Sequence, residues 1–332
     1  MKKGLLFTLG IVIGILFIVS IYAVVDMMTP KQEYKALFNR NTKVLAPELP
    51  SKASFAGEDA PLHLYYVRES FDREIMAATF MHSSTIQMFK RANRWFPVIE
   101  PILEKNGIPE DFKFLAVAES NLANVISPAG AEGYWQFMKA TGQKYGLEIN
   151  EFVDERYHVQ KATEAACRYL KDAYRKFNNW TVAAASYNRG MEGVTTALEN
   201  QKVKRYYDLF LHEETARYIY RILAIKEVYN HPVSYGFYLL EQDLYPILPT
   251  HSVSVDSSIR DLPDFALKSG INYRILRELN PWIRNYSLPN KSGKVYTFLI
   301  PNRGALEIED LLKKVPASST FFHDTLKLKE IN

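Results

Sequence analysis

The 332-residue sequence has a single cysteine, Cys167. One cysteine excludes an internal disulfide, and its position far from the N-terminus excludes a lipid-modified N-terminal cysteine. The net charge is only +4, and no long run of lysine and arginine is present. We therefore predict no nucleic-acid partner, while the small positive excess suits an anionic polymer or a membrane surface.

Several catalytic signatures are also missing. The seven histidines are scattered, without an H-E-x-x-H pattern or a Cys/His cluster, so we predict no metal site. No G-x-S-x-G segment marks a serine-hydrolase nucleophile, and no glycine-rich loop is suited to phosphates. These absences predict that the protein uses no metal or other cofactor.

An apolar segment opens the chain. Residues Gly4–Val25 carry no charge, follow Lys2 and Lys3, and precede Asp26. As a helix this segment would be roughly 33 Å long, enough for a hydrocarbon core of about 30 Å. No convincing A-x-A-like cleavage site follows it. We therefore predict an uncleaved signal anchor at residues 1–26, rather than a cleaved signal peptide, with the following residues exported.

The rest of the chain divides by its sequence pattern. Residues 27–68, with three prolines in APELPSKASFAGEDAP, predict a tether. Residues 69–241 show apolar positions three and four apart, as in the separate segments TIQMFKRANRWF and VIEPILEKNG, and predict a helical domain. Residues 250–302 predict a strand, two short helices and a closing strand, and residues 303–332 form an unassigned tail. The predicted fold class is mainly α with a small C-terminal β-α-α-β module.

One carboxylate stands out in the apolar helical segment FLAVAESNL. On a helix, Glu119 would share a face with Leu115 and Leu122. A lone acid in apolar surroundings has a raised pKa and favours its neutral form. Ser120 and Asn121 mark the end of the helix, which would place the carboxyl at a surface cleft. Glu119 is therefore either a structural acid satisfied by hydrogen bonds or a proton donor.

Two glycine-bearing breaks between helices supply polar and aromatic groups. The break SPAGAEGYWQFM carries Gln136, and its small residues allow a ligand or another chain to approach the backbone. The break SYNRG places Tyr187 and Asn188 at the end of an apolar helix. Taken singly, each of these side chains is compatible with a structural role as well as with ligand binding.

The order and spacing of these segments carry a resemblance. AES, SPAGAEGYWQFM, AASYNRG and EETARYI, in this order, resemble the successive motifs of the family 23 lytic transglycosylases. The stretches VIEPILEKNGIPEDFKFL and ATEAACRYL are similar to the membrane-bound lytic murein transglycosylase D group of that family. The resemblance covers about half of the chain and implies a lysozyme-like α-helical catalytic domain that acts on peptidoglycan glycan strands.

The resemblance also implies roles for single residues. Glu119 takes the position of the single catalytic acid. Six residues fall where the family contacts its saccharide: Ser127, Gln136, Met138, Tyr187, Asn188 and Tyr218. Of these, Tyr218 matches the tyrosine that lies close to the acid, and Ser186 stands before Tyr187 where alanine is usual.

The implied reaction needs only one acid. Ordinary glycosidases use two carboxyl groups, about 5 Å apart when retaining and some 6.5–9.5 Å apart when inverting. Asp111 would lie about 12 Å from Glu119 on a continuous helix, and nothing requires Glu132 to approach from its loop. In a lytic transglycosylase, Glu119 would protonate the bond between N-acetylmuramic acid and N-acetylglucosamine and then deprotonate the muramic C6 hydroxyl, which closes a 1,6-anhydro ring. A hydrolytic muramidase like goose-type lysozyme and a non-catalytic peptidoglycan-binding envelope protein are the alternatives.

The C-terminal module resembles a diverged LysM fold, which binds peptidoglycan or chitin. LPDFALKSGINYRILRELNP aligns with the two helices of that fold, and YTFLIP with its last strand. The segment Ile259–Asp261 replaces the Gly-Asp-Thr turn that helps form the sugar groove. The module is therefore either a glycan-binding unit or a structural cap. Together with the single cysteine and the predicted anchor, the resemblance places the protein in a bacterial cell envelope, membrane-anchored and facing the wall.

Overall fold

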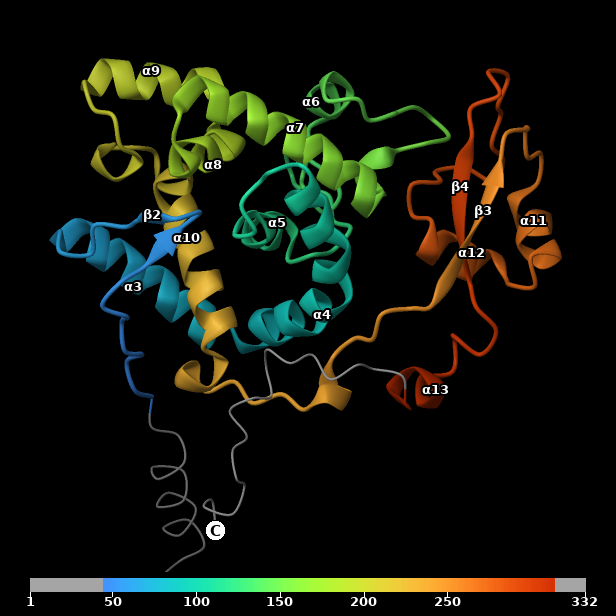
Figure 1. Cartoon of the computed structure of the whole chain (residues 1–332), viewed down its shortest axis with the longest axis horizontal. Helices are drawn as coiled ribbons and strands as arrows, with labels where there is room; N and C mark the ends of the chain where they lie inside the picture. The colour runs from blue at the N-terminus through green and yellow to red at the C-terminus, as the bar shows by residue number, and fades with distance from the viewer. Residues whose placement is uncertain (1–43, 314–332) are drawn as a thin grey trace, which may run out of the picture. The chain divides into compact units, whose positions relative to one another are not determined.

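The structure is a computed structural model that describes residues 44–313 (Figure 1). The predicted signal anchor at residues 1–26 and the end of the predicted tail lie outside the described residues. Within residues 44–313, no helix combines the length and the apolar character needed to cross a membrane. What the structure describes is a mainly helical domain followed by a β-α-α-β module.

Among the described residues, eight α-helices precede the module. Their bounds are α3 Tyr65–Phe80, α4 His82–Lys105, α5 Phe112–Ser120, α6 Lys139–Lys144, α7 Val159–Phe177, α8 Trp180–Arg189, α9 Met191–Gln201 and α10 Glu213–Asn230. Short 3-10 helices lie between or after them: η1 Glu155–Tyr157, η2 Tyr206–Asp208, η3 Pro232–Tyr235 and η4 Glu241–Asp243. Helix α5 lies near the middle of the domain and contacts α4 and α10 (Figure 1). The short central helix is therefore held by two longer ones.

Helix α4 contains most of the two segments TIQMFKRANRWF and VIEPILEKNG in one continuous helix. It continues through Pro97 and Pro101, although a proline inside a helix costs about 3 kcal/mol. Its buried positions recur at three- and four-residue spacing and include Phe89, Phe96 and Leu103. Burial of each large apolar side chain contributes about 1.5–3 kcal/mol, so the buried face outweighs the proline cost.

Helix α5 ends at Ser120, as Ser120 and Asn121 predicted. It runs over Phe112–Ser120 and ends because Asn121 adopts the left-handed conformation with φ 50°, a common end to a helix. Leu122 follows with φ 54°, so it lies outside the helix and not on the helical face predicted for it, yet it is 1% exposed. Seven of the nine side chains of α5 are buried. This tertiary packing explains how so short a helix is stable.

Part of the segment predicted as a tether packs on the helical core. Strands β1 Ser54–Phe55 and β2 Glu58–Asp59 form an antiparallel hairpin. Phe55 is fully buried, and its ring meets that of Phe112 edge to face at 4.9 Å. The Glu58 carboxylate accepts hydrogen bonds from the backbone N–H groups of Trp180 and Thr181, at 2.6 and 2.8 Å. These contacts satisfy the free N–H groups at the start of α8.

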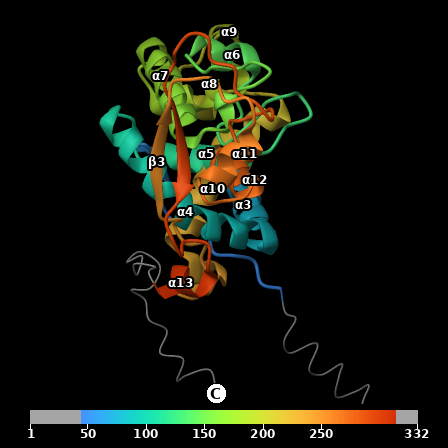
Figure 2. The same ribbon diagram turned by 90° about the vertical axis from the view of Figure 1, so that its right-hand side faces the viewer.

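The C-terminal module has the predicted β-α-α-β order. Its elements are β3 Thr250–Val255, α11 Leu262–Lys268, α12 Tyr273–Leu279 and β4 Tyr296–Pro301, followed by α13 Ile308–Lys313. Strands β3 and β4 pair antiparallel, with α11 and α12 packed beside them (Figure 2). In the segment that replaces the LysM turn, Ile259 pairs with Leu288, and the Asp261 carboxylate caps α11 by accepting from the Asp264 N–H at 2.8 Å. This segment therefore has a structural role.

A loop of the helical domain completes the core of the module. Val153 is 1% exposed and belongs to the buried cluster that contains Trp282 and Ile283. The Asp154 N–H donates to the Trp282 carbonyl at 2.8 Å, and the Arg284 N–H donates to the Phe152 carbonyl at 2.8 Å. The module is thus joined to the helical domain by backbone pairing and by shared apolar burial.

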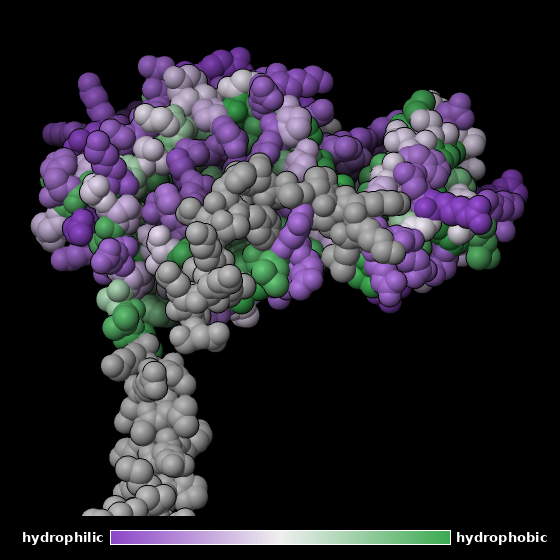
Figure 3. All heavy atoms as spheres, turned by 60° about the horizontal axis from the view of Figure 1, so that its bottom comes forward, coloured by the Kyte–Doolittle hydropathy of each residue, from purple (hydrophilic) through white to green (hydrophobic). Residues whose placement is uncertain are grey.

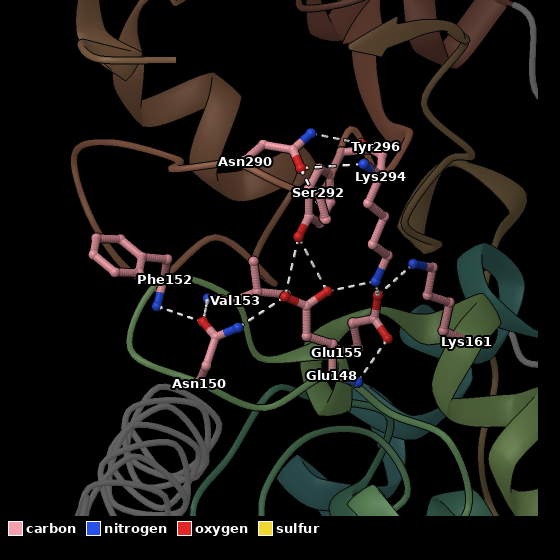
Figure 4. A network of polar contacts seen from close by, with 10 residues as sticks. All are labelled: Glu148, Asn150, Phe152, Val153, Glu155, Lys161, Asn290, Ser292, Lys294 and Tyr296. Atoms are coloured by element: carbon pink, nitrogen blue, oxygen red, sulfur yellow. Dashed lines mark hydrogen bonds and ion pairs between the residues drawn. The ribbon is translucent and has the colours of Figure 1, made fainter. Parts of the chain in front are cut away.

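A polar network reinforces this junction (Figure 4). Glu148 and Glu155 of the helical domain both accept from the ammonium of Lys294, at 3.2 Å for Glu155. The Tyr296 hydroxyl donates to Glu148 at 3.0 Å, and Lys161 of α7 also pairs with Glu155. These contacts hold β4 and its preceding loop against the segment around η1.

The molecular face in Figure 3 carries mostly hydrophilic residues, with smaller hydrophobic areas between them. This distribution matches a fold whose large apolar side chains lie inside. Phe71 and Trp135 of the helical domain and Phe298 of the module are all fully buried.

Candidate active site

A cavity of about 490 Å³ opens beside the end of α5. Residues from α3, α4, α5 and α10 line it, together with Val125 of the loop that follows α5. Its volume is in the range of pockets that bind a drug-sized molecule. The lining is largely apolar, with charged side chains at only a few positions.

Glu119 lies in the last turn of α5 and lines this cavity. It is partly exposed, while its helix neighbours Leu115, Ala116 and Val117 are buried. The Tyr218 hydroxyl, from α10, donates a hydrogen bond to Glu119 Oε1. Tyr218 is itself 2% exposed, so the contact between the two side chains is largely shielded from water.

Burial raises the pKa of Glu119 from 4.5 to about 7. The hydrogen bond from Tyr218 and the positive charge of Arg221 act to lower this pKa, and the negative charge of Glu214 acts to raise it. The desolvation effect is the largest. Near neutral pH the carboxyl can therefore hold a proton and give it up, which is the requirement for general acid and base chemistry.

Other acids that could act as a second carboxylate are held in ion pairs. Glu74 also lines the cavity, but it is 2% exposed and Arg217 pairs with it at 2.6 Å. Glu132 pairs with Arg156 at 3.0 Å. Asp111 pairs with Lys226 at 2.7 Å and accepts the Ala56 N–H at 2.7 Å. Two acids line the cavity, Glu74 and Glu119. Within residues 44–313, Glu119 is the one that has no short ion pair with a cation.

Tyr187 lies within electrostatic reach of Glu119, but neither Tyr187 nor Asn188 is part of the cavity lining. Burial and the nearby Glu119 charge both raise the Tyr187 pKa. The Tyr187 hydroxyl donates to the Trp135 carbonyl at 2.8 Å. Asn188 Oδ1 accepts from the Thr215 hydroxyl at 2.9 Å, which ties the end of α8 to the start of α10. The two contacts hold the end of α8 against the loop at Trp135 and against the start of α10.

The remaining predicted residues lie on the loop between α5 and α6. Gln136 donates to the Val125 carbonyl at 3.0 Å, and Val125 lines the cavity. Ser127 closes a turn by accepting from the Ala131 N–H at 2.9 Å. Met138 is 46% exposed. These three side chains are not part of the cavity lining, so the structure places them on the adjoining surface.

The loop depends on Gly133. Its φ of 81° favours glycine, and a Cβ at this position would collide with the backbone carbonyl of Arg156. The loop is therefore pressed against η1, and Ser120 Oγ holds it from the other direction by donating to the Tyr134 carbonyl at 2.8 Å.

No role was predicted for three charged residues that line the cavity: Glu74, Arg217 and Arg221. The two arginines lie four residues apart on α10 and flank Tyr218, so helical spacing could have indicated them. Glu74, on α3, is distant in sequence and carries no comparable signal. Within residues 44–313, no cluster of three or more potential metal-ligating side chains is found.

Two parts of this chain match known domain families. Residues 97–210 match the family described as "Transglycosylase SLT domain", and residues 251–304 match the "Soluble lytic transglycosylase C-terminal LysM-like domain". This chain contains an SLT domain and a LysM-like domain. The SLT match includes Glu119 but ends before Tyr218, the residue that touches it.

Two relatives carry the same name. The "Membrane-bound lytic murein transglycosylase D" of Escherichia coli strain K12 is 25% identical over 252 residues, which cover 74% of this chain and 54% of that protein. The protein of the same name from an Escherichia coli O6:H1 strain gives the same values. This chain thus spans about half the length of the curated relatives it matches. At 25% identity its relationship to them is distant.

Proposed function

We propose that this protein is a lytic transglycosylase that cleaves the β-1,4 bond between N-acetylmuramic acid and N-acetylglucosamine in peptidoglycan. The observation that supports this most directly is Glu119, a cavity-lining acid with a pKa of about 7. The other acid that lines the cavity, Glu74, is held in an ion pair with Arg217 and is not free to serve as a second base. The SLT and LysM-like matches support the same polymer as substrate. The protein then acts in the cell envelope, in remodelling or turnover of the wall.

The reaction balances with one acid and no water. Protonated Glu119 gives its proton to the glycosidic oxygen, the bond from that oxygen to muramic C1 breaks, and positive charge develops at C1. The carboxylate of Glu119 then accepts the proton of the C6 hydroxyl while O6 bonds to C1. The products are a free N-acetylglucosamine end and a 1,6-anhydro-muramic end, and Glu119 is again protonated. General acid and base help of this kind contributes roughly 10²–10⁴ in rate.

Neighbouring side chains have supporting roles in this proposal. Tyr218 stabilises the Glu119 carboxylate between the two proton transfers, because a hydroxyl donor favours the charged form. Tyr187 and Asn188 hold the end of α8 in place and contact the sugar rings. Gln136, together with Ser127 and Met138, contacts the saccharide along the loop that follows α5.

Digestion of purified sacculi tests the proposal. The wild type should release muropeptides that end in 1,6-anhydro-muramic acid, and Glu119→Gln should lower the rate by about 10²–10⁴. Mass analysis separates the anhydro product from the hydrolytic product, which is heavier by one water molecule. Co-sedimentation of Glu119→Gln with sacculi should show that binding persists.

Glu199→Gln is the matched control, because Glu199 is an exposed glutamate of α9, and it should retain full activity. Equal muropeptide release by the wild type and Glu119→Gln would contradict catalysis by this acid. Release of free reducing ends in place of anhydro ends would instead identify a hydrolytic muramidase.

We further propose that the N-terminal apolar segment anchors the protein in the membrane. The length of the run Gly4–Val25 and the preceding lysines support this. The full chain should fractionate with membranes and resist alkaline extraction, whereas a chain starting at residue 27 behind a cleavable signal should be released. Recovery of the full chain in the soluble periplasmic fraction would contradict the anchor.

A further inference from the structure

One wall of the cavity, formed by α3 and α10, carries two arginines around a buried carboxylate. Arg217 Nε donates to Glu74 Oε1 at 2.6 Å, and Arg221 Nε lies 3.9 Å from Glu74 Oε2. The Glu74 side chain is 2% exposed, whereas those of Arg217 and Arg221 are 29% and 37% exposed. Glu74 therefore holds the Arg217 guanidinium by a hydrogen bond and attracts that of Arg221 over a longer distance, while both guanidinium groups stay partly exposed.

The charges on the cavity wall do not cancel. Its charged residues are Glu74, Glu119, Arg217 and Arg221. With Glu119 protonated, one positive charge is in excess. Within residues 44–313, the long contact with Glu74 is the only ion pair of Arg221. Because a guanidinium has five N–H donors, Arg221 keeps donors for a ligand, in the fork geometry that matches a carboxylate.

The rest of the cavity indicates what would carry that carboxylate. Several apolar side chains line it: Ala77, Ala78, Met88, Val117, Ile225 and Val228. The sugar rings and their N-acetyl groups offer apolar C–H and methyl surface but no anion. In a peptidoglycan strand the anion comes from the substituent on O3 of muramic acid, which is a lactyl group that bears a short peptide with free carboxylates.

We propose that Arg221, positioned with Arg217 by Glu74, binds a carboxylate of the O3 substituent of muramic acid beside the bond to be cleaved. This inference rests on the proposed function because it takes peptidoglycan as the ligand. It makes the cavity a specificity site, which distinguishes strands by the group attached to the sugar and not by the sugar alone. The carboxylate belongs either to the peptide stem or to a lactyl group without a peptide.

Calorimetric binding to the full chain with Glu119→Gln tests this without turnover. The ligands are a disaccharide-tripeptide muropeptide, the same compound with its carboxylates converted to amides, and the disaccharide with a bare lactyl carboxylate. Adding Arg221→Gln should weaken binding of the acidic muropeptide at least tenfold and leave the amide form unchanged. Arg221→Lys should restore part of the affinity. Arg175→Gln, on exposed α7 surface, is the matched control with the same loss of charge and should have no effect.

The ligands also identify the source of the carboxylate. Arg221-dependent binding of the bare lactyl compound assigns the lactyl group, and dependence confined to the tripeptide compound assigns the stem. Equal affinity of the acidic and amide forms, an equal loss of both in Arg221→Gln, or no binding of any muropeptide would overturn the inference. Failure of the wild type to form anhydro ends would overturn the proposed function alone, since this binding experiment uses no catalysis.

Discussion

Two glutamates of this protein, one at the cavity and one at the junction with the module, have pKa values shifted in opposite directions. Glu119 is partly exposed, and burial raises its pKa to about 7. Glu155 is only 3% exposed, and burial also acts to raise its pKa. Nevertheless, hydrogen bonds from the Glu148 N–H and the Lys161 ammonium, with the charge of Lys294, lower the Glu155 pKa below its ordinary value.

Burial acts to raise the pKa of both acids. It prevails at Glu119, whereas the direct partners of Glu155 outweigh it. Glu155 has two ammonium groups and a backbone N–H at 2.9 Å, which stabilise its carboxylate and suit a permanent structural contact. Glu119 has one neutral hydroxyl donor and a cation, Arg221, that acts without a short ion pair. Such a site suits a group that must change its charge during a reaction.

The largest expected effect concerns stability at the cavity. Because the folded-state pKa of Glu119 is about 7 and the ordinary value is 4.5, the folded protein binds more protons than the unfolded chain between these pH values. The free energy of unfolding of the wild type should therefore fall by up to about 3 kcal/mol through this range. Glu119→Gln removes that loss, so its stability relative to the wild type should increase from pH 4 to pH 8. Urea unfolding of both proteins measures this, and a constant difference would contradict the assigned pKa.

The stabilising contribution of Glu155 at the junction should depend on pH in the opposite direction to that of Glu119. Glu155→Gln removes a charged partner of two lysines and should lower the free energy of unfolding by about 2 kcal/mol at pH 7. Since the folded-state pKa of Glu155 is lowered, its stabilising contribution is present above its unfolded pKa and is lost as the pH falls through the folded value. The difference from the wild type should thus shrink in acid, as followed by urea unfolding from pH 7 downward. Glu164→Gln, an exposed change on α7, should show no such dependence.

The smallest expected effect concerns Tyr218, whose hydroxyl donates to Glu119. Tyr218→Phe removes a hydrogen bond that favours the carboxylate, so the Glu119 pKa should rise further. The alkaline limb of the pH–rate profile should move to higher pH, while the maximal rate falls roughly tenfold because the carboxylate intermediate loses its donor. Tyr238→Phe, at a 58% exposed tyrosine, is the control. An unchanged alkaline limb in Tyr218→Phe would show that this tyrosine does not influence the pKa of Glu119.

Much of the fold followed from local patterns. Three- and four-residue spacing predicted the helical domain, and the change of pattern after residue 250 predicted the β-α-α-β module. The continuity of α4 through Pro97 was not predicted, because a proline is a local signal to stop and the burial that overrides it is tertiary. The packing of Phe55 and Glu58 on the helical core was missed for a related reason. Their partners, Phe112 and the start of α8, are distant in sequence.

The candidate site was predicted in part. The family resemblance implied that Tyr218 lies close to Glu119, and the Tyr218 hydroxyl donates a hydrogen bond to Glu119. The roles of Ser127, Gln136, Met138, Tyr187 and Asn188 in saccharide binding stay predictions. Glu74 was missed because it lies on α3, distant in sequence from α10, and the spacing of Arg217 and Arg221 on α10 does not connect them to it.

The sequence by itself determined which residue types are present and in what order: a lone acid in an apolar helix, two glycine-bearing breaks, and a C-terminal module of strands and helices. Those features follow from local periodicity, from backbone preferences and from motif spacing. Only the tertiary structure decided which acids are neutralised by cations and which is left beside a cavity with a hydroxyl donor. The physical reason is that desolvation and ion pairing depend on what lies within a few ångströms in space, and α3, α5 and α10 meet there from distant parts of the chain.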